Sequence, residues 1–112
     1  MTIVVYAVVD VDPAQRAAAL LDAKPHVDAA LAQPGCLSYA WTADPHDAAR
    51  VHVFEEWTGQ DALAAHLAGP AYRGMLGHMQ SAGITSAVSH KYAVTAKQPV
   101  YDPEGRPRAD FF

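Results

Sequence analysis

Two side chains in the second half of the chain could carry out acid–base chemistry. His66 lies in line with Leu63 and Leu67 on the apolar side of a predicted helix, so its imidazole should point inward. With an ordinary pKa of about 6.5, an imidazole could accept the proton of a phenol. Tyr72 lies on the same side one helix later, and its hydroxyl could bind an aromatic substrate. We predict His66 and Tyr72 as the catalytic residues.

Both residues also have a purely structural interpretation. A buried histidine commonly binds a carboxylate, and Glu55 could in this way tie the helix of His66 to the sheet. A tyrosine on the inner face of a helix more often packs its ring in the core and keeps its hydroxyl near the surface. The sequence leaves these alternatives open.

Five further side chains could form the walls of a pocket for a flat ligand. Tyr39 and Trp41 alternate onto one face of a predicted strand, and Trp57 ends the next strand. Met75 and Met79 repeat at helical spacing. We predict all five as substrate-binding residues. The alternative is packing in the core or at a subunit contact, and Trp57 in particular is suited to anchor the core.

The remaining polar residues support no metal, nucleotide or nucleic-acid site. His52, His78 and His90 lie on three separate elements without the spacing of metal ligands. Cys36 is the only cysteine, which excludes an internal disulfide and a paired-cysteine site. No glycine-rich nucleotide loop or hydrolase motif occurs. The formal net charge of −4, without a cluster of Lys or Arg, argues against binding to nucleic acid or to anionic membranes.

Length and composition fit one globular domain. The chain has 112 residues, of which 51% are hydrophobic and 18% charged. The apolar run at the N-terminus lacks the basic residues and the small-residue cleavage site of a signal peptide. No stretch approaches the length of a membrane span. We expect a cytoplasmic protein.

The apolar pattern predicts the element order β-α-β-β-α-α-β. Residues 3–9 are β-branched or aromatic with almost no alternation, which indicates a strand buried on both faces. Asp12 and Pro13 should begin a helix that Pro25 kinks or splits. The inner face of this helix should carry apolar residues at helical spacing, namely Ala17, Leu20, Leu21, Val27 and Leu31.

The rest of the chain should contain a strand hairpin, two helices and a final strand. Leu37 should share one strand face with the two aromatic residues that follow it at alternate positions. Thr58 and Asp61 resemble a capping box at the start of the first of these helices. The predicted boundaries are residues 36–43 and 50–57 for the hairpin strands, Pro70 and Gly83 for the second helix, and 84–96 for the last strand.

This order predicts an α+β, ferredoxin-like fold, in which helices cover one face of an open four-stranded antiparallel sheet. Because the first strand needs cover on both faces, we expect a homodimer in which the open sheet faces of two copies meet. Residues 1–96 should form the domain. Residues 97–112 contain three prolines and should form an extended tail. This tail either frays or docks Phe111 and Phe112 on a partner subunit.

Residues 55–70, EEWTGQDALAAHLAGP, resemble the signature of antibiotic biosynthesis monooxygenase (ABM) domains. That signature combines a strand ending in Glu-x-Trp, a capped helix with Ala-Leu and an inward His, and a Pro that opens the next helix. The turn Pro34-Gly35-Cys36, leading into a strand with Tyr39, is similar to the family's second strand. With the element order, the resemblance covers about residues 2–96.

The resemblance implies a dimeric α/β barrel with a pocket between sheet and helices. It also implies cofactor-independent oxygenation of a phenolic, quinol or polyketide-type aromatic. In this chemistry polar residues deprotonate the phenol, and the substrate anion reduces oxygen without flavin or metal.

Departures from the family pattern argue against haem. Haem-degrading relatives carry an Asn on the first strand, a Trp on the short helix and a ligand His ten residues later. This chain contains no Asn, and His66 and Leu76 occupy the other two positions, so we expect no cofactor. We expect an enzyme of the oxygenase type. The alternatives are a cyclase or isomerase acting on a similar substrate, and a non-catalytic small-molecule-binding or stress-associated dimer.

Overall fold

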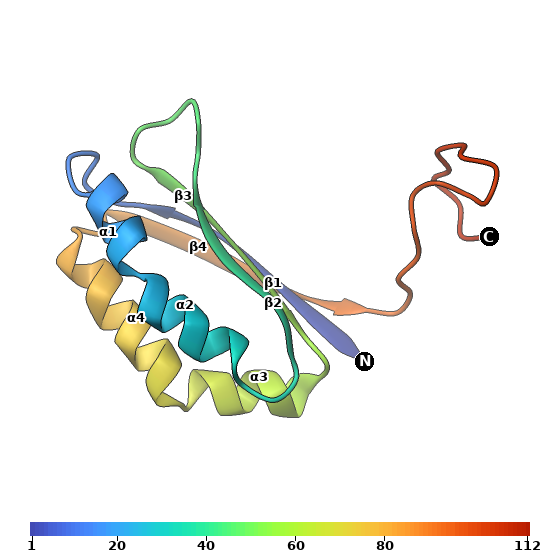
Figure 1. The fold of residues 1–112 in the computed structure, drawn as a ribbon, viewed down its shortest axis with the longest axis horizontal. Coiled ribbons are helices and arrows are strands. Elements are labelled where there is room, and N and C mark those ends of the chain that lie inside the picture. The colour runs from blue at the N-terminus through green and yellow to red at the C-terminus, as the bar shows by residue number, and fades with distance from the viewer.

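The computed structural model describes residues 1–112 and consists of one sheet covered on one face by four helices (Figure 1). Its strands run antiparallel in the order β2-β3-β1-β4. This confirms the predicted α+β, ferredoxin-like architecture with an open sheet. The elements are β1 (Thr2–Asp10), α1 (Arg16–Asp22), α2 (Lys24–Leu31), β2 (Cys36–Ala43), β3 (Arg50–Trp57), α3 (Gln60–Leu67), α4 (Pro70–Ser81) and β4 (Ser86–Val94).

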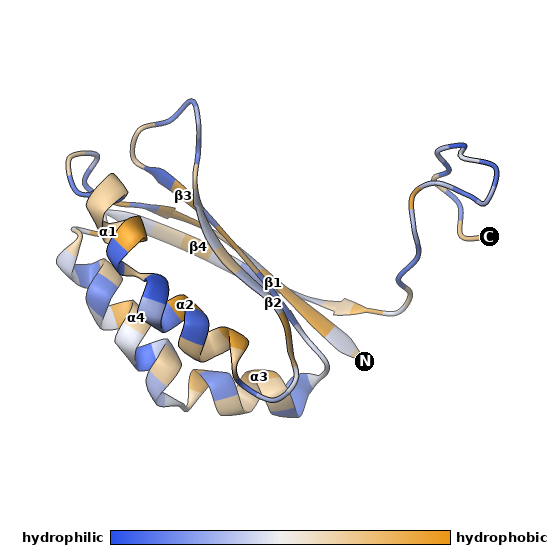
Figure 2. Cartoon of the chain, in the orientation of Figure 1, coloured by the Kyte–Doolittle hydropathy of each residue, from blue (hydrophilic) through white to orange (hydrophobic).

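The sheet has an inner face toward the helices and an outer face on the opposite side. Ala7 of β1 pairs with Val53 of β3 and with Ser89 of β4, and directly paired residues of antiparallel strands point to the same side. The inner face also carries Val5, Val9, Val51, Glu55, Trp57, Ala87 and Lys91. The outer face carries Val4, Tyr6, Val8, Phe54, Val88 and Tyr92. Figure 2 shows hydrophobic residues along β1, which both faces share.

The predicted burial of β1 is confirmed on its inner face, whereas cover of its outer face by a second copy stays a prediction. Ala7 and Val9 on the inner face are buried, whereas Tyr6 on the outer face is exposed. The helices reach only one side of the sheet, so no helix of this chain covers the other side. The apolar outer face is therefore left for another molecule.

The first helical segment is split as predicted, but its start and its buried face differ from the prediction. Asp12 caps a turn, with its Oδ1 accepting the backbone N–H of Ala14 at 3.0 Å, and α1 begins only at Arg16. Pro25 occupies the first turn of α2, where its missing N–H costs no hydrogen bond.

The break between α1 and α2 also changes which side of each helix faces the sheet. Of the predicted inner residues, Leu20 and Val27 pack against the core, whereas Ala17, Leu21 and Leu31 are exposed. The prediction counted one continuous helical period through residues 17–31, but α1 and α2 are separate helices, and each turns a different side toward the sheet. The buried positions are instead taken by small residues, which let the helices lie close to the sheet, namely Ala19, Ala23 and Ala30.

The second helical pair follows the predicted boundaries more closely. The capping box does not form, because Gly59 is the N-cap of α3 and no side chain caps the helix. Pro70 opens α4, and Gly83 with a φ of +77° lets the chain turn after it. None of the four helices has the length and apolar content that a membrane span requires.

The helices are offset toward one side of the sheet. Helices α1 and α2 pack on β2, and α3 packs on β1 and β3, whereas β4 packs mainly against β1. Every residue of β4 except Val94 is exposed. The inner face near β4 is therefore only partly covered, and this is where a cavity can form.

The predicted face of β2 is wrong at Leu37, because a β-bulge interrupts the strand there. The register with β3 shifts between Cys36 and Ser38, so Leu37 has no opposite residue and its side chain is exposed. The bulge follows Gly35, whose φ is +83° and whose carbonyl accepts the N–H of Thr58 at 2.8 Å. A Cβ at position 35 would lie 2.6 Å from the Cβ of Ala62.

We expect Gly35→Ala to lower the free energy of unfolding by about 2 kcal/mol or more. The added Cβ would have to sit on a residue with left-handed backbone, and it would overlap with the side chain of Ala62. The matched control is Gly77→Ala in the middle of α4, where an added Cβ meets nothing within 4 Å. That change should raise stability by about 0.5–1 kcal/mol through helix propensity. Denaturant unfolding measures both, and equal effects would contradict the structure.

Candidate active site

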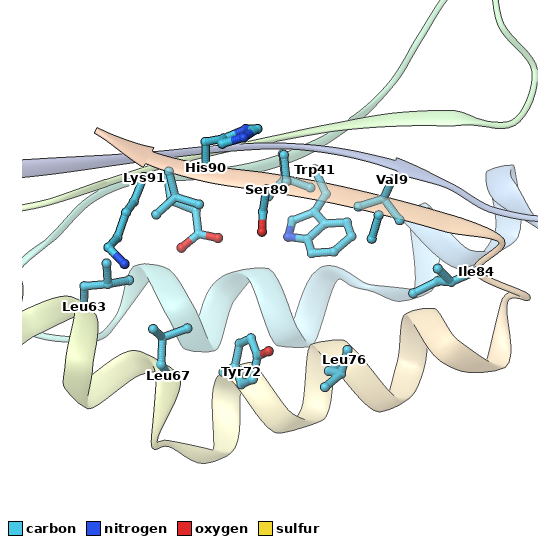
Figure 3. A pocket seen from close by; sticks show the side chains of 15 residues that line it. Val9, Trp41, Leu63, Leu67, Tyr72, Leu76, Ile84, Ser89, His90 and Lys91 are labelled. Carbon is cyan, nitrogen blue, oxygen red and sulfur yellow. The ribbon is translucent and has the colours of Figure 1, made fainter. Parts of the chain in front are cut away.

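A cavity of about 390 Å³ lies between the inner face of the sheet and helices α3 and α4 (Figure 3). Of its 15 lining residues 11 are hydrophobic, which with this volume is typical of small-molecule sites. Figure 3 shows Trp41 projecting into the space from the sheet, with Tyr72 and Leu76 facing it from α4. His90 also borders the cavity, but its side chain lies on the other side of the sheet.

Three polar side chains, Glu55, Ser89 and Lys91, line this otherwise apolar space together with the hydroxyl group of Tyr72. Glu55 and Lys91 both pair with Val5 of the intervening strand β1, so they lie at the same level of the sheet. Figure 3 shows Lys91 extending from the sheet toward Leu63. A carboxyl group and an ammonium group thus lie at one end of an apolar cavity, where both could act on an acidic hydroxyl group of a ligand.

Glu55 has the environment of a proton acceptor. Its side chain is only 12% exposed, and its Oε1 accepts a hydrogen bond from Nε1 of Trp57 at 3.0 Å. Burial raises the pKa of Glu55, and the bond from Trp57 opposes this effect only in part. A carboxyl group whose pKa is moved toward neutrality can take up and return a proton during a reaction.

His66 lies beneath this carboxyl group and does not line the cavity. Its side chain is 1% exposed, and its ring is 4.6 Å from that of Trp57 between centroids. Nδ1 is 2.6 Å from Oε1 of Gln33, and Nε2 is 3.9 Å from Oε1 of Glu55. With the Gln33 oxygen as acceptor, the hydrogen resides on Nδ1, and the lone pair of Nε2 faces Glu55. Burial lowers the pKa of His66, which favours this neutral form.

The structure brings two of the seven predicted site residues to the cavity and places the others behind it. Tyr72 and Trp41 line the space. Tyr39 is buried, and its hydroxyl accepts the indole N–H of Trp41 at 3.0 Å, so it orients that ring. The buried residues Trp57, Met75 and Met79 belong to the hydrophobic core. The functional roles assigned to these residues and to His66 remain predictions.

Sequence reasoning found Tyr72, gave Glu55 only a structural role, and missed Ser89 and Lys91. Glu55 has the strand parity of Trp57, and this parity alone could have placed it on the inner face. Ser89 and Lys91 alternate on β4 in the same way. Gln33 gave no comparable signal, because its bond to His66 joins two positions that are 33 residues apart.

Comparison with known proteins relates the chain to one family. The sequence model described as antibiotic biosynthesis monooxygenase matches residues 2–77, and no curated protein matches the chain. The structure of a candidate antibiotic biosynthesis monooxygenase from Caulobacter crescentus has a TM-score of 0.71 at 26% identity, over 85% of this chain and 91% of that one.

Two further solved structures share the fold at lower identity. A candidate antibiotic biosynthesis monooxygenase from Deinococcus radiodurans has a TM-score of 0.79 at 16% identity, over 89% of this chain and 99% of that one. A protein from Mycobacterium tuberculosis has a TM-score of 0.74 at 19% identity, over 88% of this chain and 100% of that one.

We expect His66 to make stability depend on pH. The unfolded chain binds a proton at His66 with a pKa of about 6.5, whereas the folded chain binds it only at lower pH, so acid favours unfolding. Between pH 7 and 5.5 the free energy of unfolding should fall less in His66→Gln than in the unchanged protein. The difference should be at most about 1.4 kcal/mol per pH unit. Parallel curves in urea unfolding at each pH would contradict this.

Proposed function

Because this chain belongs to the antibiotic biosynthesis monooxygenase family, we propose that it oxygenates a small phenolic, quinol or polyketide-type aromatic with O₂ and without a cofactor. The observation that supports this most directly is the apolar cavity with Glu55 and Lys91 at one end. A flat ring would lie between Trp41 on the sheet side and Tyr72 on α4, with an acidic hydroxyl group directed toward the two charged groups.

The first step of the proposed reaction is removal of the phenol proton. Glu55 accepts this proton, and its raised pKa lets it hold the proton while the reaction proceeds. The ammonium group of Lys91, on the exposed edge strand β4, attracts the resulting anion. His66 packs against Trp57, whose indole N–H holds the carboxyl group of Glu55, so it is a positioning residue that acts through Trp57, in place of the direct catalytic role predicted from the sequence.

The second step uses the electrons of the substrate anion to reduce O₂. A C–O bond forms between a ring carbon that carries two hydrogens in the keto form and one oxygen atom, which gives a peroxide. Glu55 returns its proton to the peroxide, and the freed carboxylate then removes the remaining hydrogen from that carbon while the O–O bond breaks. The carbon becomes a carbonyl group, and the second oxygen leaves as water. One CH₂ group and one O₂ thus give one C=O group and one H₂O.

We expect Glu55→Gln to lower kcat for O₂ consumption with an anthrone or hydroquinone by about 100-fold or more, because it removes the proton acceptor. The matched control is Glu56→Gln, the neighbouring carboxylate on the outer face, which should retain the rate. An oxygen electrode measures both, and thermal unfolding checks that each variant is folded. Equal rates in the two variants would remove Glu55 from the mechanism, and substrate turnover without O₂ would favour a cyclase or isomerase.

We also propose that two copies associate through their outer sheet faces. This surface carries apolar side chains together with His90 beside Tyr6, and the polar groups of Tyr6, His52 and Asp44 bond one another. The hydroxyl of Tyr6 donates to Nδ1 of His52 at 2.7 Å, and Nε2 of His52 donates to Oδ1 of Asp44 at 2.8 Å. This bond and two backbone N–H groups lower the pKa of Asp44, which keeps it an acceptor. The face can therefore be covered without leaving the Tyr6 hydroxyl unpaired.

We expect Phe54→Glu on the outer face to weaken this dimer by about 100-fold or more, because burial would desolvate an unpaired carboxylate in each copy. Leu21→Glu is the control, since Leu21 is an exposed apolar residue on α1, away from that face. Sedimentation equilibrium gives both dissociation constants. A monomeric unchanged protein, or an unchanged dissociation constant in Phe54→Glu, would contradict association through this face.

A further inference from the structure

The C-terminal arm, residues 95–112, extends away from the rest of the molecule. Figure 1 shows it leaving the end of β4 and turning back on itself at a distance from the sheet and helices. No residue beyond Ile84 belongs to the hydrophobic core or packs against it. The radius of gyration is 15.8 Å, whereas a compact chain of this length has about 13 Å. The arm is therefore not folded onto its own domain.

The arm nevertheless has an ordered shape of its own. Oδ1 of Asp102 accepts the N–H groups of Glu104 and Arg106 at 3.0 and 2.9 Å, which closes a turn. The chain end folds back, so that the side-chain amide of Gln98 bonds both the N–H and the carbonyl group of Phe112. The guanidinium carbon of Arg108 lies 4.9 Å from the ring centroid of Phe112.

This shape exposes apolar groups that an isolated segment would not hold in place. The exposed apolar side chains of the arm are Val100, Tyr101, Phe111 and Phe112. The arm also encloses a hollow of about 370 Å³, bordered by Val100, Arg108 and Phe111 among others. A single small hairpin is marginal in water, because it buries too little apolar surface to offset the cost of ordering it. The arm thus presents apolar side chains that its own domain does not cover.

The start of the arm indicates where a surface to cover these side chains lies. Nζ of Lys97 bonds Oε2 of Glu56 at 2.9 Å, and Glu56 pairs with Val4 and Ser38 on the outer face of the sheet. The arm therefore leaves along the face on which we place the second copy, and it passes beyond the end of its own sheet. A second copy packed on this face would meet the arm.

We propose that the C-terminal arm of each copy docks on the other copy, so that the two chains exchange arms. This rests on the dimer of the proposed function. Phe111 and Phe112 contact the second copy. Lys97 and Glu56 hold the arm in the direction that makes the exchange possible.

The direct test places the photocrosslinker p-benzoylphenylalanine at position 111, in a tagged copy mixed and refolded with untagged unchanged protein. Irradiation should give a covalent product of one tagged and one untagged chain. The control position is 21, because Leu21 is 78% exposed and Phe111 is 67% exposed, yet Leu21 lies on α1. Equal yields at the two positions, or crosslinks only within one chain, would overturn the arm exchange.

Substitution gives an independent measurement. Phe111→Ser together with Phe112→Ser should raise the dissociation constant of the dimer about tenfold or more, since two apolar side chains lose their contacts. Leu21→Ser should leave it unchanged. A dimer that dissociates equally in both variants would overturn the arm exchange and leave the outer-face dimer in place. An unchanged protein that is monomeric in sedimentation would overturn both, and neither outcome bears on O₂ consumption, which tests the chemistry separately.

Discussion

The offset of the helices on the sheet is the constraint on which the cavity and the partner surface both depend. Four short helices cover the inner face over β2 and β3 and leave the inner side of β4 largely open. The cavity occupies this uncovered part, so it needs no deformation of the packed core around Trp57 and Met79. The same layout leaves the outer face without any cover from its own chain. One arrangement of layers thus produces a ligand site and an apolar surface for a second copy.

Strand β3 connects these two surfaces through simple alternation. Glu55 points inward to the cavity, and its neighbours Phe54 and Glu56 point outward. A shift of register by one residue would exchange these directions and move the carboxyl group from the cavity to the dimer face. The bulge at Leu37 lies opposite the end of β3 and absorbs one extra residue of β2, so the central part of the sheet keeps its register.

Patterns within one element predict the fold well and the site only in part. A β-branched run predicts β1 and alternation predicts β2, while the proline at position 25 and the glycine at position 83 mark helix boundaries. Each of these effects acts within a few residues. The phase of α1 could not be predicted, since the break at Ala23 is a property of two helices together. The link from Gln33 to His66 and the position of Lys91 beside the cavity depend on how distant elements pack, and no local pattern encodes that.

The presence of an ionisable group at position 55 is explained by chemistry better than by stability. The indole N–H of Trp57 needs an acceptor, and a glutamine oxygen would satisfy it without the cost of burying a charge. Glutamate bears that cost, which is visible as its raised pKa. His66 adds no compensating positive charge, because its own burial favours the neutral form. A buried carboxyl group that forms no salt bridge with Lys or Arg, at the edge of an apolar cavity, is stabilised in its protonated form and is therefore suited to receive a proton from a bound molecule.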